Sequence, residues 1–176
     1  MDPRCGVEGC GLPCTLGHLL NHCSKTLDRF KFRHKYVLNH MLKRVSDNKP
    51  ENMEVCTDLQ GWKVNGGTVP PSQVLTGQVT DLVMVERSSN PVKVALLELT
   101  VTFDNRKNLK EATERKEEQY RRLTAELKDA RYAAMNIPLE TGSQGVVSAR
   151  NFGVLTTIAQ LTGIRDIKNF RRTTSV

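Results

Sequence analysis

The feature that most constrains this chain is an apolar hairpin, residues 80–102, that contains two carboxylates. Residues 79–85 alternate as a strand does. One face carries Val79, Asp81, Val83 and Val85, and the other carries Leu82 and Met84. A Ser-Ser-Asn-Pro turn signal at 88–91 separates this strand from a second one over 92–101. The second strand is so apolar that we expect it at the centre of a sheet.

The two carboxylates are Asp81, near the start of the first strand, and Glu98, deep inside the second. A buried carboxylate without a partner is unfavourable, so Glu98 needs a cation, a metal or a strong donor. Adjacent strands can bring Asp81 and Glu98 together at one end of a sheet, where two acidic oxygens can hold Mg²⁺. Two other interpretations stay open: Glu98 forms a salt bridge within the core, or its strand lies at a sheet edge.

Length and charge limit the classes of protein that fit. The 176 residues suffice for one modest domain with a real core plus an appendage. A net charge of +7 and a pI near 9.3 favour a polyanionic partner, although charge alone does not separate nucleic acid from a membrane surface. No apolar run approaches membrane-spanning length, and no hydrophobic signal region opens the chain. We therefore expect an intracellular protein with reduced cysteines and no membrane partner.

The N-terminal segment, residues 1–24, has the composition of a zinc knuckle. Four of the five cysteines fall within the first 23 residues, together with two histidines. In a reducing compartment this pattern favours zinc over disulfides. The preferred ligands are Cys5, Cys10, His18 and Cys23. A compact rival set replaces Cys5 by Cys14, His22 is a further spare ligand, and disulfides or free thiols are the alternative to any metal site. A segment this small needs its Zn²⁺ to fold.

A basic helix is predicted next, over residues 25–48. Residues 25–49 contain eight lysines and arginines against two aspartates, which leaves a charge of +6. An apolar stripe of helical spacing runs through Phe30, Val37, Leu38, Met41, Leu42 and Val45. This concentration of charge beside a zinc module favours phosphate contacts over a merely solvated helix face. The candidate nucleic-acid-binding residues are Arg29, Lys31, Arg33, His34, Lys35, Lys43 and Arg44.

The remaining chain divides into a connector, a core and a tail. Residues 49–78 are rich in Asn, Gly and Pro, so we expect loops with one short strand near 59–64 that carries Trp62. Cys56 reads as a core residue. Residues 79–165 contain the hairpin, a long helix over 109–131, a strand over 133–140 and a helix over 148–161. Residues 166–176 form a basic tail. This order predicts a mixed α/β domain with helices flanking a central sheet.

The long helix has an inward stripe with one exception. The stripe consists of Leu109, Ala112, Lys116, Tyr120, Leu123 and Leu127. A lysine there can extend outward to solvent. If instead it faces the end of the sheet that carries Asp81 and Glu98, it is a cation beside two acids.

Several passages, taken together and in order, resemble a known family. They are the CCHC finger, RFKFRHKYVLNHML, TDLVMV, VALLELTVTFDN and LETGSQGVV. They are similar to the C-terminal region of LINE-like retrotransposon polyproteins, which joins a zinc knuckle to a restriction-like endonuclease of the PD-(D/E)XK fold. The resemblance covers nearly the whole chain. Its most specific part is the acid hairpin ending in Glu-Leu-Thr, and the Arg33-His34 pair after the finger is fairly specific.

The resemblance implies roles for three residues. Asp81 matches the Asp of the Pro-Asp element and Glu98 the second acid, and both would bind the catalytic Mg²⁺ or Mn²⁺. Many members of this fold have a lysine two residues after the second acid, where this chain has Thr100. Lys116 is therefore the candidate substitute, placed to orient water or stabilise phosphate charge. Thr80 stands where the family usually has proline.

The implied function is a metal-dependent DNA endonuclease that nicks target DNA for insertion, in the nucleus. Its expected partners are DNA, element RNA and an upstream reverse-transcriptase segment, because this chain contains no Asp-Asp dipeptide of a polymerase site. The alternatives are a non-catalytic, zinc-dependent nucleic-acid-binding module or a decayed, inactive copy of the element. A folded α/β protein with neither role is disfavoured by the finger and by the concentrated charge.

Overall fold

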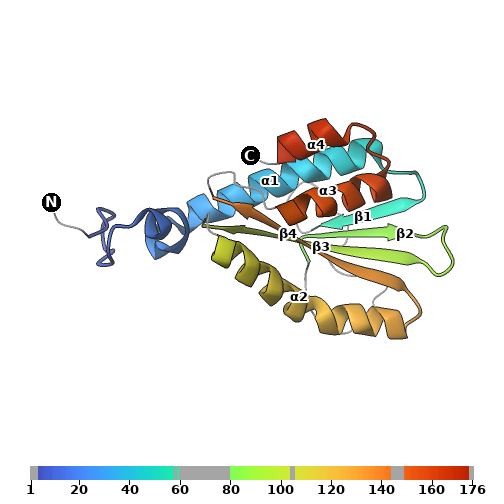
Figure 1. Ribbon diagram of the computed structural model, residues 1–176, viewed down its shortest axis with the longest axis horizontal. Coiled ribbons are helices and arrows are strands. Elements are labelled where there is room, and N and C mark those ends of the chain that lie inside the picture. The colour runs from blue at the N-terminus through green and yellow to red at the C-terminus, as the bar shows by residue number, and fades with distance from the viewer. Residues whose placement is uncertain (1–3, 58, 60–79, 104–105, 144–148, 175–176) are drawn as a thin grey trace.

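The computed structural model describes residues 4–57, 59, 80–103, 106–143 and 149–174. A four-stranded mixed sheet is covered by helices on both faces, and a small Cys/His module projects from one end of it (Figure 1). The mixed α/β architecture with flanking helices that the sequence predicts is therefore confirmed. None of the described helices is long and apolar enough to cross a membrane.

The sheet has the strand order β1-β2-β3-β4. The strands are β1 (Met53–Thr57), β2 (Leu82–Glu86), β3 (Lys93–Thr102) and β4 (Ala133–Gly142). The first two pairings are antiparallel, whereas β3 and β4 are parallel and are connected through helix α2 (Arg106–Asp129). Because β3 has a neighbour on each side, the prediction of a central second strand is confirmed and the edge-strand interpretation of Glu98 is wrong.

Helix α2 covers one face of the sheet with the stripe read from the sequence. The side chains of Leu109, Ala112, Tyr120, Leu123 and Leu127 are buried, whereas Lys116 is half-buried. The strand residues on this face include Cys56, Val83, Val85, Val94, Leu96 and Ala134. The assignment of Cys56 to the core is thus confirmed.

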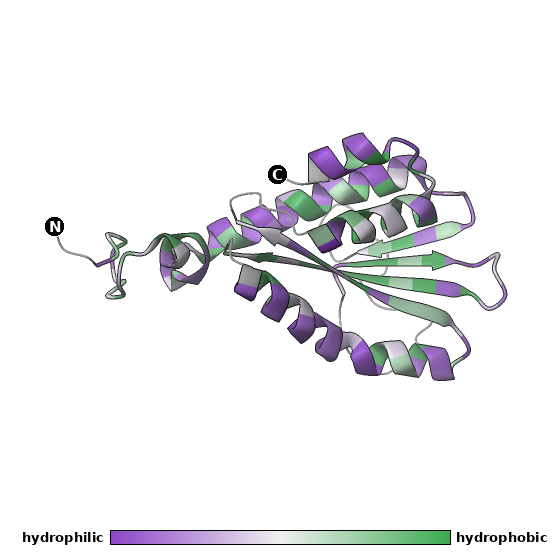
Figure 2. Cartoon of the chain, in the orientation of Figure 1, coloured by the Kyte–Doolittle hydropathy of each residue, from purple (hydrophilic) through white to green (hydrophobic). Residues whose placement is uncertain are grey.

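Three helices form the layer on the opposite face: α1 (Leu27–Asn48), α3 (Ala149–Thr162) and α4 (Ile167–Thr174) (Figure 1). They contact the alternate strand residues, among them Leu82, Met84, Leu97, Leu99 and Leu139. Figure 2 shows largely hydrophobic strands between helices that mix hydrophilic and hydrophobic residues. A strand sandwiched in this way has two buried faces, which explains why β3 is an almost continuous apolar run.

The Cys/His module leads directly into α1. A π-helical turn, η1 (His18–His22), and a 3₁₀ turn, η2 (Ser24–Thr26), immediately precede that helix. The Asn21 amide donates to the Val101 carbonyl at 3.3 Å, and the Arg33 guanidinium donates to the carbonyls of Leu20 and Ser143. These contacts attach the module to the carboxyl ends of β3 and β4, so the zinc-type module and the sheet end lie side by side.

The structure differs from the sequence interpretation at three places. Residues 53–57, expected to be loop, form β1, because their apolar side chains complete both cores beside β2. Of the strand expected near 59–64, only Leu59 belongs to the described residues, and Trp62 and Val79 lie outside them. The hairpin strand β2 begins at Leu82. The basic tail is helical over Ile167–Thr174, because Phe170 is buried in the core.

Candidate functional site

The N-terminal module brings together one set of metal-ligating side chains. The ligand atoms of Cys5, Cys10, His18 and Cys23 all lie within 4.8 Å of one another. The Cys10 Sγ and His18 Nε2 atoms are 3.2 Å apart. Three thiols and an imidazole converging this closely match the soft and borderline donors that tetrahedral Zn²⁺ takes in structural sites. This set can bind a zinc ion, and it is the ligand set preferred from the sequence.

The two spare ligands lie outside this cluster. Cys14 is an exposed free thiol, and His22 is exposed with its Nδ1 atom 3.1 Å from the Gly17 carbonyl. A backbone hydrogen bond explains why Cys5 belongs to the cluster. The Cys5 amide donates to the Leu12 carbonyl at 2.8 Å, which folds the first loop back and carries Cys5 toward the helical turn. The rival set that contains Cys14 is therefore not the one assembled.

Glu98 is buried in the middle of the sheet and is surrounded by donors. Its side chain is 3% exposed. The Lys116 ammonium lies 3.0 Å from Oε2, and the Asp81 backbone N–H donates to Oε1 at 3.2 Å. Tyr120 donates a further hydrogen bond to the same carboxylate. The partner that the sequence analysis predicts for Glu98 is thus the Lys116 ammonium, together with the Asp81 N–H and the Tyr120 hydroxyl.

The electrostatic surroundings of Glu98 do not fully stabilise its charge. Burial raises the pKa of this carboxyl above its ordinary value, and the negative charge of Asp81 raises it further. Lys116 and Tyr120 oppose that shift without cancelling it. Burial and the Glu98 charge likewise raise the pKa of the Tyr120 hydroxyl, so this group stays protonated and keeps donating. A cation bound beside Glu98 would relieve the remaining cost of its charge.

Asp81 lies directly before the first residue of β2, beside Glu98 of β3, and its carboxylate is fixed by two groups. Its Oδ2 atom accepts from the Leu99 N–H at 2.8 Å and lies 3.2 Å from His34 Nε2. The same imidazole nitrogen lies 3.1 Å from the Leu99 carbonyl, so both neighbours are acceptors and Nε2 must carry the proton. The Asp81 side chain remains 17% exposed, and Oδ1 accepts no hydrogen bond from the described residues.

The structure therefore brings Asp81, Glu98 and Lys116 together, as the sequence interpretation required. Asp81 and Glu98 come from adjacent strands, and Lys116 reaches them from α2. The Lys116 ammonium also lies 5.5 Å from the centre of the Tyr120 ring, one helical turn away on α2. With its side chain 21% exposed, Lys116 turns inward to Glu98 instead of extending into solvent.

Asp81 and Glu98 supply the type of donor that a hard divalent cation takes. Mg²⁺ takes oxygen ligands and is commonly held by one or two carboxylates plus water. Asp81 offers the Oδ1 atom, and the Glu98 carboxylate, which accepts from Asp81, Lys116 and Tyr120, retains one further lone pair. When bound, the ion would supply a Lewis acid and an activated water.

Thr100 and Glu140 lie beside the site on the α2 face. They are opposite one another across the parallel β3–β4 pair. The Thr113 hydroxyl bonds to Glu140 Oε1, whereas the buried Thr100 hydroxyl and Glu140 Oε2 have no hydrogen-bond partner among the described residues. Thr100, which stands at the usual lysine position of the resembled fold, therefore does not bond to Glu98.

The basic residues of α1 separate into distinct environments. Arg29, Lys31, Lys35 and Lys43 are exposed and can meet a phosphate backbone, whereas Arg44 is half-buried. Arg33 is committed to backbone carbonyls of the module and of the β4 end, and its guanidinium also covers the Phe30 ring at 5.5 Å. Arg33 therefore connects the N-terminal module to the end of β4.

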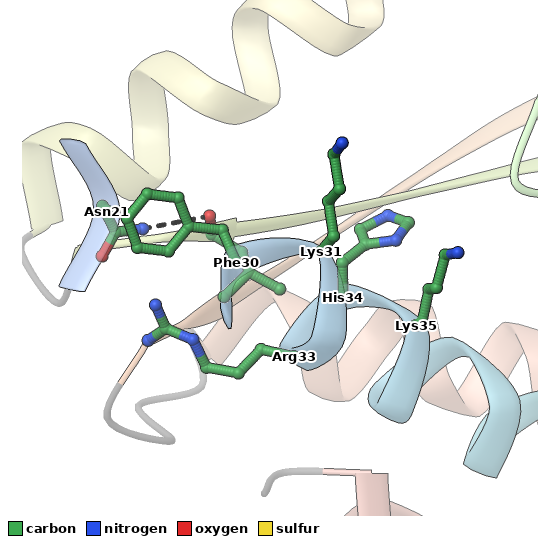
Figure 3. Close-up of a pocket in the computed structure, with 7 residues that line it drawn as sticks. Asn21, Phe30, Lys31, Arg33, His34 and Lys35 are labelled. Atoms are coloured by element: carbon green, nitrogen blue, oxygen red, sulfur yellow. Dashed lines mark hydrogen bonds between the residues drawn. The ribbon is translucent and has the colours of Figure 1, made fainter. Parts of the chain in front are cut away.

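A hollow of about 300 Å³ lies between α1, the module and the end of β3. It is lined by Asn21, Phe30, Lys31, Arg33, His34, Lys35 and Val101 (Figure 3). In Figure 3 the side chains of Lys31, His34 and Lys35 lie toward the same side of the helix, while Arg33 extends toward Phe30. Because His34 contacts Asp81, this hollow adjoins the acid cluster.

The sequence interpretation missed two members of this site. The sequence pattern predicts only a nucleic-acid contact for His34. Because His34 lies three and four residues before the buried Val37 and Leu38, its helix face is nevertheless directed toward the sheet. For Tyr120 the pattern predicts only a place in the apolar stripe. It lies four residues after Lys116, on the same helix face, which was the available signal for a shared contact with Glu98.

Comparisons with known proteins identify no relative of this chain. No protein-family model matches it, and neither the curated proteins nor the solved structures contain a significant match.

Proposed function

We propose that this chain is a divalent-metal-dependent DNA endonuclease domain of the restriction-like kind found in LINE-like retrotransposon polyproteins. One observation supports the proposal above others: Asp81, directly before β2, meets Glu98 of the adjacent strand β3 and Lys116 of α2, beside a basic helix. A pair of acids with a nearby lysine is an arrangement that can support metal-assisted phosphodiester hydrolysis.

Each residue has a distinct part in the proposed reaction. Asp81 and Glu98 hold Mg²⁺ or Mn²⁺, with the Asp81 carboxylate oriented by His34 and by the Leu99 amide. Lys116 orients the attacking water or stabilises charge on the scissile phosphate. Tyr120 stays protonated and holds the Glu98 carboxylate in place. When held by Asp81 and Glu98, the ion would supply an activated water and positive charge that offsets the charge of the transition state.

DNA reaches this site along α1 in the proposal. Lys31 and Lys35 flank His34 at the hollow next to Asp81, so phosphates held by these lysines pass close to the acids (Figure 3). Arg29, Lys43 and Arg44 add positive charge along the same helix. Such contacts position a backbone without reading bases, and they weaken steeply with salt.

The proposed setting is the nucleus, with element RNA and an upstream reverse-transcriptase segment as further partners. Under this proposal Zn²⁺ is structural. It holds the module that Asn21 and Arg33 attach to the sheet end. Loss of zinc would then disturb the DNA path while leaving the acid cluster itself in the α/β core.

The decisive experiment is nicking of supercoiled plasmid by the zinc-loaded chain with Mg²⁺ or Mn²⁺. We expect nicking by the wild type and its loss in Asp81→Asn and Glu98→Gln. Lys116→Met should lower the rate about 100- to 1,000-fold, as loss of one preorganised charge-stabilising group does. The matched control is Lys110→Met on the same helix, whose lysine is 77% exposed and paired with Glu114. Equal activity in Lys116→Met and Lys110→Met would refute the role of Lys116.

A non-catalytic, zinc-dependent nucleic-acid-binding module is the second candidate, including a decayed copy of such an element. The observation that favours it is the ion pair itself, because Lys116 and Tyr120 satisfy Glu98 without a metal, as in structural ion pairs. Thr100 in place of lysine points the same way. This candidate predicts salt-sensitive DNA binding by the wild type with no metal-dependent nicking to lose.

A further inference from the structure

Phe32 and Tyr36 form an exposed aromatic pair on α1. Their side chains are 68% and 53% exposed, and their ring centres lie 6.2 Å apart with 27° between the ring planes. Phe30, two residues earlier, is half-buried and covered by the Arg33 guanidinium. Phe32 and Tyr36 therefore present two large, exposed rings side by side, which form an open apolar surface.

This pair lies on the side of α1 that faces away from the sheet. An α-helix turns about 100° per residue, so both Phe32 and Tyr36 lie about 160° around the helix from His34. His34 contacts Asp81, and the buried residues of α1 are on the sheet side with it. The two rings are therefore outside both the core and the candidate active site.

Two exposed cations, Arg29 and Lys43, flank the rings. Arg29 lies three residues before Phe32 and Lys43 seven residues after Tyr36, both on the outward side of α1. The two cations are exposed and form no ion pair with any residue that the structure describes. At 1.5 Å per residue, the distance from Arg29 to Lys43 along the helix is about 21 Å. The face thus presents flat rings between two positive charges.

This combination is selective for one kind of ligand. Phosphates bind the cations, and bases stack on open aromatic rings only when the bases are unpaired. Bases inside a duplex are already stacked on each other and present only their edges. A purely apolar partner would leave Arg29 and Lys43 without counter-charges. A single strand supplies both the anions and the π-faces.

We propose that Phe32 and Tyr36 are a stacking platform for unpaired bases of single-stranded DNA, whose phosphates contact Arg29 and Lys43. The platform deepens the proposed function, on whose nucleic-acid role it rests. Because it lies on the opposite side of α1 from His34, the platform holds unpaired nucleotides away from the strand that lies at the acids.

The test is fluorescence anisotropy with the full zinc-loaded chain and four labelled probes of equal length. The probes are a mixed-sequence DNA single strand, the same strand built from abasic sites, the DNA duplex and the RNA single strand. We expect Phe32→Leu and Tyr36→Leu each to weaken binding of the mixed-sequence strand about tenfold, as loss of one stacking ring does. Binding of the abasic strand and of the duplex should stay within about twofold of wild type, because their contacts are ionic. Phe152→Leu, a 44% exposed ring on α3, is the matched control.

Three outcomes would overturn the proposal. Equal losses on the abasic strand and the duplex would show that the rings support the fold or the charges. A wild-type dimer that the variants abolish, measured by analytical ultracentrifugation, would make this face a contact between two copies. Binding of the RNA strand more than about tenfold tighter than the DNA strand would assign the platform to RNA. Nicking and stacking are separate readouts, so a catalytically inactive chain that keeps the stacking signature refutes the endonuclease and not the platform.

Discussion

Glu98 is a carboxylate in the middle of an apolar strand, held by Lys116, by Tyr120 and by the Asp81 amide. These donors lower the cost of its charge, but burial and Asp81 dominate and the pKa of Glu98 stays raised. The ionised form of Glu98 is therefore electrostatically unfavourable, and a nearby cation would stabilise it. The same residue therefore connects the stability of the core with the proposed chemistry.

Replacing Glu98 by Gln should stabilise the metal-free chain at neutral pH. Because the folded-state pKa is raised, the folded chain binds this proton more tightly than the unfolded chain does. Its contribution to the free energy of unfolding therefore falls as pH rises through the unfolded and then the folded pKa. The stability of Glu98→Gln relative to wild type should accordingly be greater at about pH 8 than at about pH 4.5. Urea unfolding at both pH values, without divalent metal, measures this difference.

A stability gap between these two proteins that does not change with pH would show that Glu98 is ionised in the folded chain as easily as in the unfolded chain. A loss of stability in Glu98→Gln at neutral pH would show that the Lys116 ion pair outweighs burial.

The helices and the Cys/His module contribute different residues to the core and to the candidate site. Helix α2 carries Lys116 and Tyr120 on the stripe that also packs against the sheet, so one helix supplies both core and site. Helix α1 carries the apolar stripe toward the sheet, His34 at the acids and the Phe32–Tyr36 pair outward. The Cys/His module has hardly any core of its own: Cys5, His18 and Cys23 are buried, whereas Leu12 and Leu16 are exposed.

The module should therefore depend on zinc for its structure. We expect one Zn²⁺ per wild-type chain, measured by elemental analysis, and loss of most of it in Cys10→Ser. Cys14→Ser is the matched control, since this exposed thiol lies outside the ligand cluster and its loss should leave zinc content unchanged. If Cys14→Ser lost the metal and a further variant, Cys5→Ser, kept it, the rival ligand set, which contains Cys14 in place of Cys5, would be correct.

At the scale of the whole molecule, the C-terminal segment completes the helical layer that contains α1 and α3. Phe170 of α4 is 1% exposed and belongs to the larger core cluster. The Arg171 guanidinium donates to the Phe152 carbonyl on α3 at 3.1 Å. The segment that reads as a basic tail is thus part of the folded domain.

Phe170→Ala should lower the free energy of unfolding by about 3–5 kcal/mol, because it removes a buried ring and leaves a cavity. Phe152→Ala is the control, as its 44% exposed ring should cost less than about 1 kcal/mol. Chemical denaturation of both variants, followed by far-UV circular dichroism, gives the comparison. Similar small losses in both variants would mean that α4 is not packed on the core.

The sequence alone determined those features of the structure that depend on residues close together along the chain. The alternation of residues 82–85, the stripe of α2 with Lys116 on it, and the zinc ligands within residues 5–23 all follow from local periodicity or spacing, and the structure has each of them. Such patterns can be read because neighbours along the chain decide which face a side chain occupies.

Only the tertiary structure decided which strand and helix faces contact one another. The β2–β3 register brings the Asp81 amide to Glu98, and the docking of α1 brings His34 to a carboxylate 47 residues away. The same packing buried Phe170 in a segment whose composition indicates only a basic tail. These contacts depend on register and on helix placement, which are set by the total packing of both cores and have no local sequence signature.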